Sequence, residues 1–148
     1  MKSYSDSPGA IYPALRRLDQ QGLIRGRIQQ GSGLRRRQVF HITAKGIVEL
    51  KKWIARPLTQ DDLAGGLKEV MLRFAFSEHT AGANASVQLI RDLRAQLEDY
   101  VPTLHAQLKA GKAAMSRSGG LALESGIRSY ESLLEWTRYA LASYSRKE

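Results

Sequence analysis

A seven-residue repeat in the last quarter of the chain limits the fold more than any other feature. It steps by four and three residues through Leu123, Ile127, Tyr130, Leu134, Thr137, Leu141 and Tyr144. These steps place every position on one face of an α-helix, and a sustained repeat is typical of helices that pack like a coiled coil. The same steps predict a second long helix from about Ala83 to Ala110, through Ile90, Leu93, Leu97, Tyr100 and Leu104.

A shorter helix, from about Asp61 to Phe76, is predicted after a linker over residues 57–62. It contains Gly65 and Gly66, and each glycine inside a helix costs about 1 kcal/mol relative to alanine. We predict that residues 57–148 form a helical dimerisation domain. Self-association as a two-fold homodimer would cover the long apolar faces. The predicted interface consists of Ile90, Leu93, Leu97, Leu104, Ile127, Tyr130, Leu134 and Leu141.

The first segment of the chain predicts a helix over residues 7–21. Ser7 is the candidate N-cap, Pro8 suits the first helical position, and Gly22 suits the position after the helix end. An apolar stripe follows the helical period through Ile11, Leu15 and Leu18. Such a stripe needs a surface to pack on, yet only "MKSYSD" precedes this segment.

A β-hairpin and a further helix follow. Two arms over residues 23–30 and 35–42 flank Gly-Ser-Gly at 31–33, a turn that permits positive φ. The next helix, with Thr43 as its N-cap, is predicted over residues 44–56 and ends before Pro57. The fold class is therefore mainly α with a small β-hairpin, and residues 1–56 have the order of the second half of a winged helix-turn-helix.

The formal net charge of +9 is confined to this N-terminal domain. Residues 1–56 contain twelve Lys/Arg and three Asp/Glu, whereas residues 57–148 contain eleven of each. A region of one sign is the electrostatic footprint of a phosphate-binding surface. The hairpin arginines that can reach a phosphate are Arg25, Arg27, Arg35, Arg36 and Arg37.

The residues "SPGAIYPALRRLDQQGLI" (7–24), "RRRQVFHITAKG" (35–46) and "DDLAGGLKEVMLRFAF" (61–76) resemble the PadR family of transcriptional regulators. From residue 57 onward the helical layout looks like the AphA-like branch. The resemblance implies that helix 7–21 is a recognition helix in the major groove and that hairpin 24–42 is the wing on the backbone. It also implies that Tyr12, Arg16 and Arg17 contact DNA.

The chain departs from the family pattern at three places. Leu34 stands where the family usually has a second glycine, and Arg36 replaces a common proline. Family members also carry two helices before the recognition helix, which this sequence lacks. The first explanation for the missing helices is a late gene start or a truncation. The second is that another chain supplies the surface on which the recognition helix packs.

The leading hypothesis is a homodimeric, DNA-binding transcriptional regulator, with repression as the more usual role in such families. The alternative is a dimeric protein-interaction module that has lost DNA binding. A small basic RNA-binding protein is a third possibility, disfavoured because the basic region shows no aromatic stacking platform. A small hydrophobic effector beside Tyr130 and Trp136 is a further expectation from the family.

Several classes of function are not expected. The chain has no cysteine, its three histidines share no ligand spacing, and no nucleophile–base set or phosphate-cradling glycine loop is evident. We therefore predict no enzyme, no metal and no cofactor. No stretch has the roughly 18 apolar residues of a membrane span, and no signal peptide is evident, so a cytoplasmic protein without membrane contact is expected.

Overall fold

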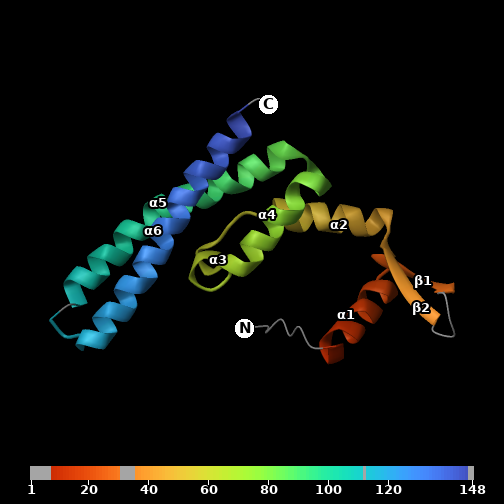
Figure 1. The fold of residues 1–148 in the computed structure, drawn as a ribbon, viewed down its shortest axis with the longest axis horizontal. Helices are drawn as coiled ribbons and strands as arrows, with labels where there is room; N and C mark the ends of the chain where they lie inside the picture. The colour runs from red at the N-terminus through yellow and green to blue at the C-terminus, as the bar shows by residue number, and fades with distance from the viewer. Residues whose placement is uncertain (1–7, 31–35, 112, 147–148) are drawn as a thin grey trace. The chain divides into compact units, whose positions relative to one another are not determined.

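The computed structural model describes residues 8–30, 36–111 and 113–146 (Figure 1). Its elements in chain order are α1 (Pro8–Gln20), β1 (Ile24–Gln30), β2 (Arg36–Ile42), α2 (Ala44–Ala55), α3 (Gln60–Ala64), α4 (Leu67–Ala81), α5 (Ala83–Gly111) and α6 (Arg117–Ser145). The predicted fold class, mainly α with one β-hairpin, is confirmed. The chain divides into two compact units, Met1–Trp53 and Ile54–Glu148.

In the first unit, Gly22 ends α1 in the way the sequence predicts. Its φ is +69°, and its backbone N–H donates to the Asp19 carbonyl at 2.9 Å. The Leu23 N–H donates to the Leu18 carbonyl at 2.9 Å. These two bonds form a Schellman motif, for which a residue with positive φ is required and glycine is preferred. The motif turns the chain sharply from α1 into β1.

The start of α2 is tied to this same turn. The Thr43 hydroxyl donates to the Gly22 carbonyl at 2.7 Å and accepts from the Gly46 N–H at 3.0 Å, so Thr43 is the predicted helix cap. A Cβ atom at Gly46 would lie 2.0 Å from the Leu23 carbonyl oxygen. Only glycine allows this close approach of backbone to backbone, which places α2 directly behind the hairpin.

The apolar stripe of α1 is only partly covered within the described residues. Leu15 is half-buried, whereas Ile11 is 47% and Leu18 is 37% exposed. Other exposed large apolar side chains of this unit are Ile28, Ile42, Ile47 and Val48. The first unit as described therefore buries little apolar surface of its own.

In the second unit, the single helix predicted from Asp61 to Phe76 is wrong: the structure contains two helices. α3 ends at Ala64, and α4 begins at Leu67. A Cβ atom at Gly66 would lie 2.8 Å from the Asp62 Cα atom, so the chain turns back on α3 too closely for a side chain. The helical period continues across this break, which is why it predicted one helix.

α6 begins at Arg117, before the glycines at 119 and 120. Ser116 caps the helix by accepting from the Gly119 N–H at 3.1 Å, and Arg117 is the first helical residue. The cap compensates for the poor helix propensity of the two glycines. α5 and α6 then run side by side, with α4 packed on α5 (Figure 1).

The core of the second unit lies where α3, α4, α5 and α6 meet. Leu63, Val70, Leu93 and Leu97 form its buried centre. Two pairs of aromatic rings pack edge to face: Phe74 with Trp136 at 5.6 Å and Tyr100 with Tyr130 at 5.2 Å between centroids. Because the rings come from different helices, they fix how the helices cross.

The side chains predicted for the dimer interface pack largely within one chain. Ile90, Leu93, Leu97, Leu104 and Ile127 are buried, and Tyr130, Leu134 and Leu141 are partly buried. Their role between two chains stays a prediction. The large apolar side chains of this unit that one chain leaves exposed are Leu72, Phe76, Met115, Leu121 and Tyr139.

Candidate nucleic-acid interface

The exposed polar side of α1 carries the first part of the candidate interface. Tyr12 is 67% exposed, and Arg16 and Arg17 are also exposed. Tyr12 and Arg16 are one helical turn apart, so they are neighbours on the same face, with Arg17 beside them. The structure thus brings together the three helix residues that the resemblance singled out.

The hairpin carries the second part. Antiparallel pairing aligns Arg25 with His41 and Arg27 with Val39. Because side chains alternate along a strand, Arg25 and Arg27 share one face of the hairpin with these two partners. A surface cleft of about 470 Å³ is lined by both arginines and by His41, Ile42 and Thr43.

The predicted arginine triplet lies at the edge of the described residues. Arg35 is outside them. The backbone register pairs Arg36 with Gln30 and Arg37 with Gln29. The expectation that the three arginines cannot share one face stays a prediction.

The four arginines of α1 and β1 have no carboxylate partner among the described residues. Arg16, Arg17, Arg25 and Arg27 form no ion pair there. The two described acidic side chains are occupied elsewhere: Asp19 accepts from the Gly26 N–H at 3.3 Å, and Glu49 pairs with Lys52 at 2.7 Å. The positive charge of the interface is therefore available to an external anion.

Sequence reasoning missed His41, and it did not assign Lys45. His41 lines the cleft because the strand register places it opposite Arg25, and no local sequence motif predicts that register. Lys45, at the start of α2, donates from Nζ to the Gln21 carbonyl at 2.8 Å. That bond satisfies a carbonyl left free at the end of α1, so Lys45 has a structural role as well as a charge.

The second unit uses its arginines differently, in a cluster between the end of α2 and the start of α4. The Asp62 carboxylate accepts from Arg56 Nη2 and the Thr59 N–H, both at 2.8 Å, and from the Thr59 hydroxyl at 3.0 Å. Burial opposes ionisation of Asp62, but these hydrogen bonds outweigh it and lower the pKa of its carboxyl group. The bond to Asp62 likewise raises the pKa of Arg56.

Arg73 in α4 is the largest fully buried side chain of the described residues. Its Nη2 atom donates to the carbonyl oxygens of Ile54, at 2.9 Å, and of Arg56. Burial lowers the pKa of this guanidinium. Nε and Nη1 have no partner among the described residues. Arg73 therefore acts as a C-terminal cap on the chain leaving α2.

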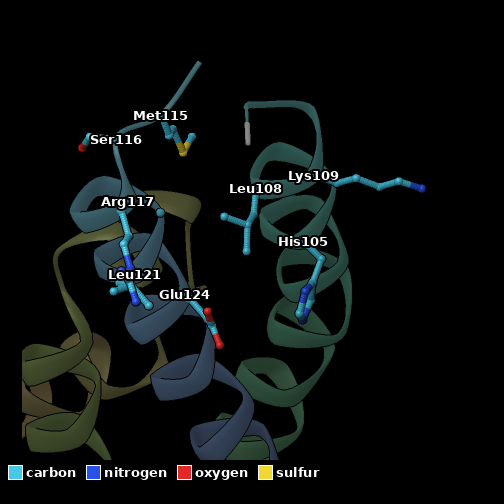
Figure 2. Close-up of a pocket in the computed structure, with 9 residues that line it drawn as sticks. His105, Leu108, Lys109, Met115, Ser116, Arg117, Leu121 and Glu124 are labelled. Carbon is cyan, nitrogen blue, oxygen red and sulfur yellow. The ribbon is translucent and has the colours of Figure 1, made fainter. Parts of the chain in front are cut away.

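The aromatic side chains expected beside an effector lie in the core. Tyr130 donates from its hydroxyl to the Leu63 carbonyl at 2.8 Å, and Trp136 packs on Phe74. A separate groove of about 580 Å³ lies between the end of α5 and the start of α6, where Leu108, Met115 and Leu121 line it (Figure 2). Lys109 points away from this groove, and Glu124, which lines it, is held by Arg128 at 2.6 Å. An effector site stays a prediction.

Two further searches concern the described residues only. They contain no group of three or more His, Asp or Glu side chains placed to hold a metal ion. No helix among them is long and apolar enough to cross a bilayer.

Comparison with known proteins shows which proteins this chain is similar to. Residues 2–52 match the family described as "Transcriptional regulator PadR-like family". A PadR-like transcriptional regulator from Bacillus cereus is similar in fold, with a TM-score of 0.50 and 23% identity over 98% of this chain and 81% of that one. The Bacillus subtilis PadR structure in complex with operator DNA matches with a TM-score of 0.44 and 23% identity, over 95% and 80% of the two chains. A search of curated proteins finds no match.

Proposed function

We propose, from the match of residues 2–52 to the PadR-like family, that this protein is a homodimeric, DNA-binding transcriptional regulator that acts as a repressor. α1 enters the major groove, and the hairpin contacts the flanking backbone. The observation that carries the proposal is the set of exposed arginines on α1 and β1 that lack a carboxylate partner among the described residues.

The two surfaces would have different roles on a duplex. Arg16 or Arg17 presents the fork of N–H donors that matches O6 and N7 of guanine in the major groove. Arg25 and Arg27, spaced by two residues along a strand, suit successive oxygens of the phosphate backbone. The helix would supply sequence preference and the hairpin most of the salt-dependent affinity.

Dimerisation is assigned to the second unit. Its exposed apolar side chains on α4 and α6, including Leu72, Phe76 and Tyr139, give a second copy surface to cover. A two-fold dimer presents two copies of α1 to one duplex, which doubles the number of contacts and favours palindromic sites.

The experiment is selection of binding sites from a random duplex pool, followed by anisotropy titration of the selected duplex. We expect log affinity to fall linearly with log salt, with a slope of about −0.9 for each phosphate contact. Arg16→Gln should broaden the selected sequence, whereas Arg25→Gln should weaken all duplexes equally. Arg91→Gln, an exposed arginine on α5 of the second unit, is the matched control.

Sedimentation of the same sample separates the alternatives. A dimer that binds the selected duplex supports the proposal. A stable dimer with no duplex binding near micromolar concentration would instead favour an interaction module. A flat salt dependence would contradict the phosphate contacts.

A further inference from the structure

We propose that His41 completes a phosphate site with Arg25 and Arg27 on the hairpin, and that protonation of His41 strengthens duplex binding as the pH falls. The inference rests on the proposed function and adds to it a residue and a mode of regulation. Its starting point is the cleft of about 470 Å³ that these three side chains line.

The strand register brings the three side chains together. His41 lies directly opposite Arg25, and Arg27 is its diagonal neighbour. Directly opposite residues in an antiparallel pair have Cβ atoms about 5 Å apart, and diagonal ones remain within reach of long side chains. All three side chains are exposed, so an anion in the cleft can meet two guanidinium groups and one imidazole at once.

The groups around His41 determine the direction of the effect. From β1 it faces Arg25 and Arg27, and Val39 is its neighbour in the same row of β2. Thr43, which follows β2, also lines the cleft. The backbone register pairs Arg37 with Gln29 further along the hairpin. A phosphate bound in the cleft attracts the imidazolium form more strongly than the neutral ring, so binding favours uptake of a proton.

Asp19 and Lys45, two charged groups on the neighbouring helices, do not line the cleft. On the α1 side Asp19 is bonded to the Gly26 N–H, and on the α2 side Lys45 is bonded to the Gln21 carbonyl. Among the described residues, no carboxylate lines the cleft. Because imidazole side chains change charge between about pH 5 and 8, the coupling acts in the physiological range.

The test is anisotropy titration of the full chain with its selected duplex at about pH 6 and about pH 8, over roughly 50 to 200 mM salt. We expect wild-type affinity to be about ten-fold higher at the lower pH, the effect of one charge-assisted hydrogen bond. The log–log salt slope should be steeper there by up to about 0.9, because one more charge meets the backbone.

Variants assign the effect to His41. His41→Gln should bind with little pH dependence, and His41→Lys, which carries a fixed charge, should bind tightly at both pH values. His79→Gln, an exposed histidine on α4 of the second unit, should keep the wild-type pH dependence. Far-UV circular dichroism checks that each variant is folded.

Two results would overturn the inference, and they are distinguishable. If His41→Gln keeps the full pH dependence while the wild type binds duplex, the phosphate site is wrong and the proposed function stands. If the wild type fails to bind any duplex at either pH, the proposed function fails and the site fails with it.

Discussion

Replacement of Asp62 tests the electrostatics of the second unit directly. Its side chain is 9% exposed and accepts hydrogen bonds from Arg56 and from the backbone and hydroxyl of Thr59. Asp62→Ala removes all of these acceptors. It also leaves Arg56 and the buried Arg73 near each other with less negative charge to offset them.

The expected magnitude follows from the contacts. The Arg56 side chain is 40% exposed, so its ion pair with Asp62 contributes only about 0.5–1 kcal/mol. Each bond from Thr59 to the carboxylate contributes about 1–1.5 kcal/mol. Asp62→Ala should therefore destabilise the second unit by about 2.5–4 kcal/mol, and Asp62→Asn, which keeps the shape and one acceptor, by about 1–2 kcal/mol.

The assay is urea unfolding followed by far-UV circular dichroism, analysed with the m-value that reports exposed surface. A carboxyl group whose folded pKa is lowered adds stability above its ordinary pKa of 3.8, and that stability is lost as pH falls through the folded pKa. The difference in unfolding free energy between wild type and Asp62→Asn should therefore be at its full value at pH 7 and should become smaller below about pH 4. Asp99→Asn, exposed on α5, is the control. The reasoning would be refuted if Asp62→Asn lowered the unfolding free energy by less than about 0.5 kcal/mol at pH 7, or if the difference from wild type grew at acidic pH.

Substitutions at three other places in the structure have expected outcomes. Gly46→Ala places a methyl group 2.0 Å from a backbone oxygen, so unfolding of the first unit should become easier by about 1–3 kcal/mol, measured by amide hydrogen exchange. The hydroxyls of Ser77 and Ser86 lie 2.6 Å apart in the core, so Ser86→Ala should cost about 1–2 kcal/mol in urea unfolding, and the Ser77→Ala/Ser86→Ala double variant less than the sum of the two. Tyr130→Phe should cost about 1 kcal/mol near neutral pH. Because burial raises the pKa of Tyr130, its contribution is present below the ordinary value of 10.0 and lost as pH rises through the folded pKa, so the cost should shrink at high pH.

Local signals predicted most of the fold. Gly22 and Thr43 mark helix ends because their roles depend on bonds to residues a few positions away, and both were assigned correctly. The apolar period located α5 and α6 for the same reason. The break between α3 and α4 was missed because it depends on how closely Gly66 approaches Asp62, which the period does not encode.

In the candidate site, too, some residues could be placed from local sequence spacing and others could not. Tyr12, Arg16 and Arg17 are neighbours through one helical turn, so their common surface follows from sequence spacing alone. His41 and Arg25 are sixteen residues apart and meet only because the register pairs Ile24 with Ile42. A register shifted by one residue would send His41 to the opposite face. Sequence spacing alone therefore does not place His41 in the cleft.

The uneven distribution of charge in the sequence becomes an uneven distribution of ion pairs in the structure. In the second unit, arginine and histidine side chains pair with carboxylates: Arg56 with Asp62 and Glu69, Arg94 with Glu98, Arg128 with Glu124, and His105 with Glu131. In the described part of the first unit, Lys52–Glu49 is the one such pair. Added salt should therefore weaken contacts of the first unit with a polyanion, because those charges are exposed and meet their partner only on binding. It should have little effect on the fold of the second unit, where the Arg56–Asp62 pair is partly sheltered and the exposed pairs contribute little.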